Sequence, residues 1–532
     1  MVRRWFYGCS TLLLIGILAA SAVIPAILWA LLIVGPLMLV GVYDVTQRQH
    51  TILRNFPIIG HGRYLFELVR PEIQQYFIES NTDAFPIERE FRDLVYQRSK
   101  GDLETQPFGT QRDVYRLGYE WAAHSLAPVV PLETPPRIPI GGADCRQPYD
   151  SALLNISAMS FGSLSSHAIM ALNGGAKAGG FAHNTGEGGI SPYHLEQGGD
   201  LIWQVGTGYF GCRTSDGRFD PDRFADQAAH NTVRMIELKL SQGAKPGHGG
   251  VLPGRKVSAE IAAIRGVPIG ETVLSPPGHP GFTTPTGLLE FVARLRALSG
   301  GKPVGFKLCI GQRTEFLRLC KAMLDTGILP DFITVDGSEG GTGAAPLEFA
   351  NSVGMPARDG WMLAHNALRG VRLRDRITII ASGKILTGFD MARALALGAD
   401  VCLSARGMML ALGCIQALRC HSDHCPTGIA TQNPALVHGL DVDAKTPRVT
   451  RFQEATVRSL LELLGAMGLS HPNALGPQHI FRRISDSRVR TLQDLHEFIP
   501  EGALLDGGGE GPWHEDWRTA CDCTLWREAE QI

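Results

Sequence analysis

Four short apolar stretches decide the fold, and each ends in a glycine-rich or polar loop: residues 303–308 (PVGFKL), 332–336 (FITVD), 377–381 (ITIIA) and 401–404 (VCLS). Amphipathic helical stretches, such as 314–324 and 390–397, lie between them. Apolar runs of this length that alternate with helices are typical of parallel strands joined by crossover helices. The sequence therefore predicts an α/β fold in this half of the chain.

Three earlier runs extend the alternation toward the N-terminus: residues 153–158, 201–205 and 235–240. Seven or eight strands over about 270 residues match a (β/α)8 barrel, the TIM barrel. An open doubly wound sheet is the alternative, but no GxGxxG motif follows the first strand. We expect the barrel.

The composition limits the classes of protein to which the chain can belong. It has 532 residues with 50 Lys and Arg against 52 Asp and Glu, a net charge of -2. This balance gives no general attraction to nucleic acid, so no nucleic-acid partner is expected. With 44% hydrophobic residues the chain can bury a large core, and its 62 glycines indicate many tight turns. Eleven cysteines are too few for a disulfide scaffold in a chain of this length, which favours a reducing compartment.

The N-terminus is strongly apolar, with no charged residue from 11 to 43 and with Arg3 and Arg4 before this run. The run is longer than one hydrocarbon core of ~30 Å needs. It predicts a transmembrane hairpin bent at Pro25 or Pro36, or one tilted span with an interfacial piece. Positive charge on both flanks favours the hairpin, with the rest of the chain in the cytoplasm. A cleaved signal peptide is the alternative, but the run exceeds an h-region of ~7–15 residues.

Four regions are expected along the chain. They are a membrane anchor over residues 1–48, a helical lead-in region over 49–140, the barrel over 141–453 and a helical C-terminal extension over 454–532. The lead-in region is polar and shows no recognisable chemistry. Any chemistry is expected in the barrel, where the loops after the strands build the active site.

Glycine-rich loops follow the last three expected strands. Residues 336–346 (DGSEGGTGAAP) contain glycines that let backbone N–H groups approach an anion. Residues 381–388 (ASGKILTG) and 404–407 (SARG) follow strands seven and eight, where barrels of this kind hold phosphate. These loops predict a phosphate cradle to which Arg406 adds charge, and an ordinary glycine turn is the alternative.

Charged residues near the other strands suggest further contacts. Lys307 lies inside an apolar strand, where an unpaired ammonium is costly, so it should face a ligand or an acid unless it reaches solvent. Glu187 lies in a glycine-flanked loop (NTGEGG). Gln242, Lys245 and Arg265 offer an amide and two cations, a set suited to a dicarboxylate, although surface loop charge is the alternative.

Three cysteines lie close together in the sequence, Cys414, Cys420 and Cys425, with Pro426 after the last. Three thiolates at this spacing favour an iron-sulfur cluster with three protein ligands. Zinc would normally use CxxC pairs, which are absent from this segment. Buried structural cysteines are the alternative.

Taken together, these motifs resemble the central FMN-binding domain of glutamate synthase. The resemblance covers about residues 140–436 and rests on motifs in this order: SAMSFGS, NTGEGG, QGAKPGHGG, LPGRKV, DGSEGGTGAAP, LTGFD, ALGC and CHSDHCPTGIATQNP. In that family a (β/α)8 barrel holds FMN and a 3Fe-4S cluster. It reduces 2-iminoglutarate, formed from 2-oxoglutarate and ammonia, to L-glutamate. The resemblance implies the same oxidoreductase activity here.

The resemblance also implies roles for individual residues. Glu187 would lie close to the substrate and act in catalysis with Lys245, and Gln242, Lys245 and Arg265 would bind 2-oxoglutarate. The cluster ligands would be Cys414, Cys420 and Cys425. The FMN site would be lined by eight residues: Met159, Ser160, Lys307, Gly341, Thr342, Gly343, Gly383 and Gly407.

Two departures from the family pattern shape the expected function. The full enzyme begins with a glutaminase domain whose N-terminal cysteine is the nucleophile, whereas Cys9 lies at the edge of the apolar run. The long glycine-repeat C-terminal domain is also missing. We therefore expect a membrane-anchored form that takes free ammonia, or ammonia from a partner. No second dinucleotide motif appears, so a ferredoxin or a reductase subunit is expected as the electron donor.

Two other functions remain open from the sequence. A membrane-anchored electron carrier or sensor would keep flavin and cluster without glutamate turnover, and the apolar N-terminus favours it. The set Gln242, Lys245 and Arg265 favours the enzyme. A barrel similar to inosine monophosphate dehydrogenase would share the GGTG loop, but it needs a catalytic cysteine loop that this sequence does not show.

Overall fold

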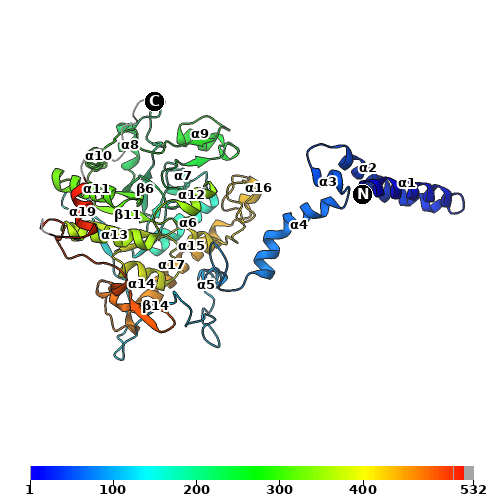
Figure 1. Ribbon diagram of the computed structural model, residues 1–532. Coiled ribbons are helices and arrows are strands. Elements are labelled where there is room, and N and C mark those ends of the chain that lie inside the picture. Colours follow the sequence, from blue (N-terminus) through cyan, green and yellow to red (C-terminus); the bar gives the residue numbers. More distant parts are fainter. Residues whose placement is uncertain (1, 507–508, 521–532) are drawn as a thin grey trace. The chain divides into compact units, whose positions relative to one another are not determined.

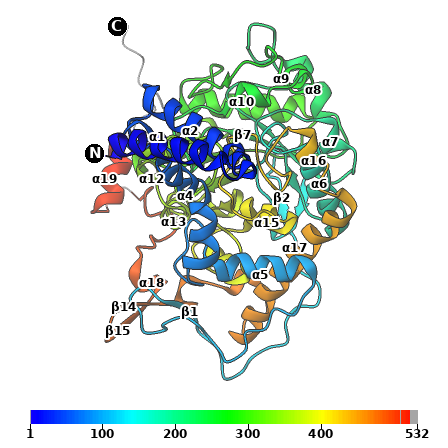
Figure 2. The same cartoon turned by 90° about the vertical axis from the view of Figure 1, so that its right-hand side faces the viewer.

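The structure is a computed structural model that describes residues 2–506 and 509–520. It divides into two units, Met1–Arg89 and Glu90–Ile532. The first unit consists of helices: α1 (Val2–Ser21), η1 (Pro25–Ala30), α2 (Leu31–Thr46), α3 (Thr51–Asn55), α4 (Gly60–Ile73) and the π-helical turn η2 (Gln74–Ile78). Figures 1 and 2 show α1 and α2 side by side.

Two segments of the first unit, Val2–Ser21 and Pro25–Thr46, are long and apolar enough to cross a membrane. This finding rests on length and composition. The chain turns between them just before Pro25, as expected, whereas Pro36 lies inside α2. The two helices pack closely, because a Cβ at Gly41 would lie 2.3 Å from the ring of Phe6. The expected hairpin shape is therefore present, and its place in a membrane stays a prediction.

The second unit contains a closed barrel of eight parallel strands. In chain order the strands are β4 (Leu154–Ile156), β5 (His183–Asn184), β6 (Leu201–Val205), β7 (Val233–Lys239), β10 (Val304–Cys309), β11 (Phe332–Asp336), β12 (Thr378–Ser382) and β13 (Val401–Ser404). Each strand pairs with the next, and β13 pairs with β4 to close the ring. The expected (β/α)8 barrel is confirmed, and the open sheet is excluded.

Helices surround this barrel, as Figure 1 shows around β6 and β11. They are α6 (Ser166–Gly179), α7 (Pro192–Leu195), α8 (Pro221–Ala228), α10 (Pro285–Leu298), α11 (Arg313–Thr326), α12 (Leu347–Ser352), α13 (Ala357–Gly370), α14 (Gly388–Ala396), α15 (Arg406–Leu412), α16 (Pro434–Val437) and α17 (Val442–Ala466). The long segment between β7 and β10 adds a small hairpin, β8 (Val251–Leu252) and β9 (Val273–Leu274), with η3 (Gly254–Lys256) and α9 (Ala259–Arg265) between its strands. This segment supplies three of the expected site residues.

The barrel interior changes from apolar to polar along the strands. A hairpin of β2 (Ile138–Ile140) and β3 (Tyr149–Ser151) packs on the side chains near the strand starts. The resulting core consists of Ile140, Tyr149, Ala182, Ile202, Met235, Phe332, Ile380, Val401 and Leu403. Gly305 belongs to this layer, because a Cβ there would lie 2.2 Å from the carbonyl oxygen of Phe332. One end of the barrel is thus filled, which leaves the carboxyl ends of the strands for chemistry.

The C-terminal extension differs from the helical region that we expected. After α17 it forms two strands, β14 (Ile480–Ser485) and β15 (Arg488–Thr491), which join β1 (Glu120–Ala122) in an antiparallel sheet visible in Figure 2. The remaining helices of this unit are α5 (Arg89–Lys100), η4 (Arg374–Arg376), η5 (Pro472–Ala474), η6 (Pro477–His479), α18 (Leu492–Leu495) and α19 (Pro512–Thr519). The sheet depends on β1, a partner distant in the sequence, so local periodicity could not reveal it.

Candidate active site

A buried polar network begins one layer above the apolar core. The carboxylate of Glu237, on β7, accepts hydrogen bonds from the amides of Asn184 (2.8 Å) and Gln204 (2.7 Å) and from the hydroxyl of Thr334 (2.6 Å). All four side chains are buried. A carboxylate that is fully hydrogen-bonded can be held inside a protein. The network therefore fixes the side chains at the mouth of the barrel.

Lys307 and Asp336 form an ion pair in the same region, with 3.1 Å between Nζ and Oδ2. Burial works against the charge on Lys307, but Asp336 and Glu237 raise its pKa on balance. Burial likewise opposes the charge on Asp336, while Lys307 and the N–H of Gly243 lower its pKa. Lys307 thus faces an acid, as one of the alternatives predicted, and does not reach solvent.

Glu187 pairs with Lys239, a residue at the end of β7 that the sequence reasoning did not select. The distance from Lys239 Nζ to Glu187 Oε1 is 2.8 Å. Burial alone would raise the pKa of Glu187, but Lys239, Arg265 and Lys245 together lower it. Gly250 lies against this acid, because a Cβ there would come within 2.3 Å of the carboxylate. Glu187 is therefore an ionised carboxylate surrounded by three cations.

Lys245 is 2% exposed, and its ammonium donates to the backbone carbonyl of Ala344 over 2.8 Å. Burial lowers the pKa of Lys245 to about 8, Lys239 acts in the same direction and Glu187 opposes them. Gln242, half-buried at the start of the same segment, accepts the backbone N–H of Lys245 at its carbonyl oxygen. This backbone bond closes the turn that carries both residues.

Arg265 comes from the last turn of α9 and is 4% exposed. Its Nη2 donates to the carbonyl of Phe161 (3.0 Å) and to the hydroxyl of Ser160 (3.4 Å), and its guanidinium lies over the ring of Phe210. Burial lowers the pKa of Arg265 to about 10, against the influence of Glu187. Within the described residues, its Nε has no hydrogen-bond partner. An unpaired buried donor of this kind is costly.

The loops after the first two strands form one wall of the site. Met159 and Ser160 are buried, and the loop that carries them packs against Gly186. Gly186 has φ +65°, and a Cβ there would lie 2.7 Å from the backbone nitrogen of Ser160. Only glycine fits such an approach in this conformation. The motifs SAMSFGS and NTGEGG therefore meet at the mouth of the barrel.

The glycine loops after β11, β12 and β13 form neighbouring walls. Gly341, Thr342 and Gly343 are exposed, and a Cβ at Gly341 would lie 2.9 Å from Cδ of Arg406. Gly383 follows β12 with φ +139°. Gly407 differs, because it is buried in α15, and a Cβ there would lie 3.0 Å from the ring of Phe452. The structure thus gives Gly407 a packing role against α17.

The three cysteines lie on the loop that follows α15, on the same side of the barrel as the glycine loops. A Cβ at Gly343 would lie 3.4 Å from Cβ of Cys420. Lys256, from η3, donates to the backbone carbonyl of Cys420 over 2.8 Å. Burial raises the pKa of Cys414 to about 11; the backbone N–H of Gln416 opposes this shift, and Cys420 and Cys425 act in the same direction as burial. The cysteines are therefore neighbours, although the described part of the chain contains no group of three His, Cys, Asp or Glu arranged to hold a metal ion.

Three important residues escaped the sequence reasoning: Glu237, Lys239 and Asp336. The first two belong to β7 (VRMIELK), where every second side chain from Met235 points into the barrel. A charged residue at an inward position of a strand is the signal that could have identified them.

The chain is similar to known proteins over most of its length. Residues 144–470 match the family described as the conserved region in glutamate synthase. The glutamate synthase large subunit-like protein YerD of Bacillus subtilis is 37% identical over 527 residues, which cover 91% of this chain and 98% of YerD. The archaeal glutamate synthase (NADPH) of Methanocaldococcus jannaschii is 36% identical over 321 residues, and the match covers 60% of each chain. A solved structure of a mutant flavocytochrome b2 with pyruvate bound covers 84% of this chain and 91% of its own, with 12% identity and a TM-score of 0.42.

Proposed function

The chain belongs to the family defined by the conserved region in glutamate synthase, and from this membership we propose that it is a glutamate synthase-like oxidoreductase. It reduces 2-iminoglutarate, formed from 2-oxoglutarate and ammonia, to L-glutamate. One observation carries the proposal: the cations Lys239, Lys245 and Arg265 surround the single carboxylate of Glu187. Two positive charges are left uncompensated, which matches the charge of a dicarboxylate.

The substrate is bound through its two carboxylates. The unpaired Nε of Arg265 and the ammonium of Lys245 bind one carboxylate each, and Gln242 adds an amide contact. Glu187 is ionised and accepts a proton when ammonia adds to the carbonyl carbon. Lys239, which is 2.8 Å from Glu187, supplies one proton to the oxygen and Glu187 returns the one it accepted, so that the oxygen leaves as water and the protonated imine forms. Holding the reacting groups in this arrangement lowers the entropy cost of the reaction.

The residues around the barrel mouth fit FMN. Seven residues would hold it: Met159, Ser160, Lys307, Gly341, Thr342, Gly343 and Gly383. The backbone N–H groups of the exposed glycine loop are open to a ligand, and Arg406 lies beside Gly341. Both features support binding of the FMN phosphate at this loop. When bound, FMN would supply the hydride that reduces the imine carbon.

The cysteine loop supports a 3Fe-4S cluster through the chemistry of its thiols. Burial opposes ionisation of Cys425, but the hydroxyl of Thr427 and the N–H groups of Ala430, Thr427 and Ile429 lower its pKa. A thiolate stabilised by backbone N–H groups is suited to iron. Cys414, Cys420 and Cys425 would hold the cluster, which would supply a one-electron path from an external donor, a ferredoxin or a reductase subunit.

The two apolar helices support a membrane location, with the barrel on the cytoplasmic side. They also favour the second candidate function, a membrane-anchored flavin and iron-sulfur carrier or sensor without glutamate turnover. The two functions are distinguished by reducing the purified protein without oxygen and then adding 2-oxoglutarate with ammonium. We expect the flavin spectrum to return to the oxidised form only when both substrates are present. An unchanged spectrum would overturn the enzyme in favour of the carrier.

A further inference from the structure

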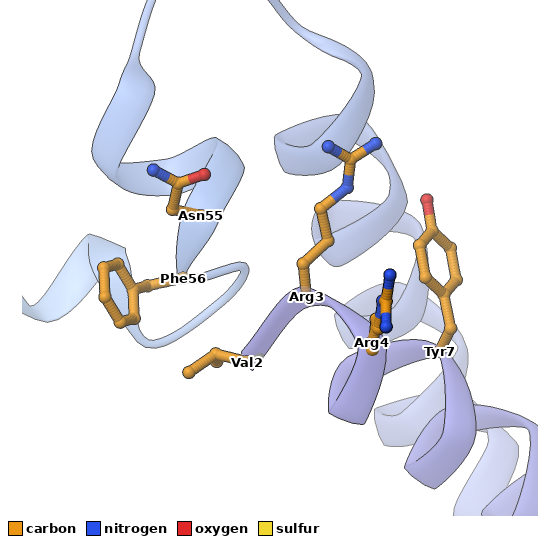
Figure 3. A pocket seen from close by; sticks show the side chains of 6 residues that line it. All are labelled: Val2, Arg3, Arg4, Tyr7, Asn55 and Phe56. Atoms are coloured by element: carbon orange, nitrogen blue, oxygen red, sulfur yellow. The ribbon is translucent and has the colours of Figure 1, made fainter.

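The N-terminal unit contains a cavity of about 530 Å³ that lies outside the barrel. Six residues line it: Val2, Arg3, Arg4, Tyr7, Asn55 and Phe56. Figure 3 shows Arg3, Arg4 and Tyr7 on the first turns of α1, with their polar ends directed to the same side; Asn55 lies at the end of α3 and Phe56 directly follows that helix. The cavity therefore combines two cations and two neutral polar groups with an aromatic ring.

The two arginines of this cavity have no counter-ion in the described part of the chain. Asp44 is the only acid among residues 1–63. It is fully buried and accepts hydrogen bonds from Nε2 of His61 (2.9 Å) and from the backbone N–H of Ile58 (2.9 Å). Asp44 thus holds the segment after α3 against the end of α2 and is not available to neutralise the arginines.

The position of the cavity along the hairpin indicates what can enter it. A helix of 20 residues, the length of α1, spans ~30 Å, which is the thickness of one hydrocarbon core. If α1 crosses a membrane, its first turn lies among the lipid headgroups. Exposed aromatic side chains mark the same end, Trp5, Tyr7 and Tyr43, and Trp29 is exposed at the opposite turn. Such aromatic residues are typical of the two membrane interfaces.

We propose that this cavity binds the phosphate of an anionic phospholipid headgroup. The inference rests on the membrane location proposed above. Arg3 and Arg4 pair with the phosphate, the Tyr7 hydroxyl and the Asn55 amide donate hydrogen bonds to it, and Phe56 contacts the lipid's apolar part. A free phosphate ion shares the headgroup chemistry, but the exposed apolar surface beside the cavity favours a lipid.

The test uses the full chain, purified in a neutral detergent, and native mass spectrometry to count bound lipid. Phosphatidylglycerol, phosphatidylcholine and inorganic phosphate are the three probes. The variant is the double substitution Arg3→Gln and Arg4→Gln. The matched control is Arg48→Gln with Arg63→Gln, which removes the same charge from the same unit but leaves the cavity lining intact. Because binding is measured in detergent, a change in membrane orientation does not affect the result.

We expect phosphatidylglycerol to bind wild-type protein about tenfold or more tightly than phosphatidylcholine, and the cavity variant to lose that preference while the control keeps it. If both variants lost the preference for phosphatidylglycerol equally, the attraction would depend on the overall charge of the unit, and the proposed site would be overturned. Displacement of the lipid by inorganic phosphate at equal concentration would overturn the lipid as its occupant. A separate wash of membranes with alkaline carbonate tests the anchor. Release of wild-type protein there would overturn the membrane location and with it this inference.

Discussion

The ammonium of Lys245 donates to the backbone carbonyl of Ala344 over 2.8 Å, which ties the segment after β7 to the glycine loop after β11. This contact leaves a buried cation on a neutral acceptor, and burial lowers the pKa of Lys245 to about 8. An anionic substrate would meet a charge that is already in place. The contact therefore connects the candidate dicarboxylate site with the candidate FMN site.

The first prediction concerns pH. Lys245 carries its charge below its pKa of about 8 and loses it above. Affinity for 2-oxoglutarate should therefore be full at about pH 6.5 and fall about tenfold for each pH unit above about 8. Calorimetric titration of the flavin-loaded protein measures it. In the variant Lys245→Met the affinity should be low at every pH, and flavin should still be bound. If the affinity of this variant depended on pH as that of wild type does, the role of Lys245 would be refuted.

The second prediction concerns Arg265, which uses one end of its guanidinium for Phe161 and Ser160 and leaves Nε unpaired. A lysine has a single charged nitrogen, so it cannot contact Phe161 and Ser160 and also bind the substrate. We expect Arg265→Lys to weaken 2-oxoglutarate binding by about 10-fold to 100-fold, the size of one charge-assisted hydrogen bond. Flavin content should stay unchanged. Equal loss of flavin and substrate would instead indicate misfolding.

The third prediction concerns Glu187. In Glu187→Gln the ammonium of Lys239 loses its carboxylate partner at 2.8 Å, and the site loses its base. Glutamate formation should fall by about 10²-fold to 10⁴-fold. The control Glu290→Gln changes an exposed acid on α10 and should leave the rate unaltered. A Glu187→Gln enzyme with near-normal turnover would exclude Glu187 from proton transfer.

The fourth prediction tests the packing of the barrel. A Cβ at Gly305 would lie 2.6 Å from Cγ of Phe332 in addition to its contact with the carbonyl oxygen, whereas a Cβ at Gly311 would meet no described atom within 4 Å. We expect Gly305→Ala to lower the free energy of unfolding by about 1–3 kcal/mol through overpacking. Gly311→Ala should change it little. Thermal unfolding of the two variants compares them directly, and equal stability would show that the core adapts at no cost.

The sequence predicted the barrel well because its strands are continuous apolar runs, which periodicity detects. All seven expected strands are present, with ends shifted by at most two residues. The eighth strand of the barrel, β5, was not expected. It has two residues, His183 and Asn184, and is too short to produce a pattern. Strand β14 was missed for another reason, because it pairs with a segment more than 300 residues earlier.

The candidate site was predictable only in part. Glycine-flanked motifs identified Glu187, Lys245 and Arg265, and the structure gathers their charges in one place. The partners Lys239 and Glu237 lie inside a strand that also carries Arg234, so their roles depend on which side chains face the barrel axis. For Gly407 the sequence suggested a ligand contact, and the structure shows close packing on Phe452. Packing of this kind depends on α17, which local sequence does not reveal.

The most direct test of the central claim is a single turnover with isotopically labelled ammonium. The protein, loaded with FMN and reduced without oxygen, is mixed with 2-oxoglutarate and the labelled ammonium, and the product is identified by mass spectrometry. We expect labelled L-glutamate in an amount equal to the flavin that is reoxidised, and none from Lys245→Met. Reoxidation of the flavin without labelled glutamate, or no reoxidation at all, would contradict the account.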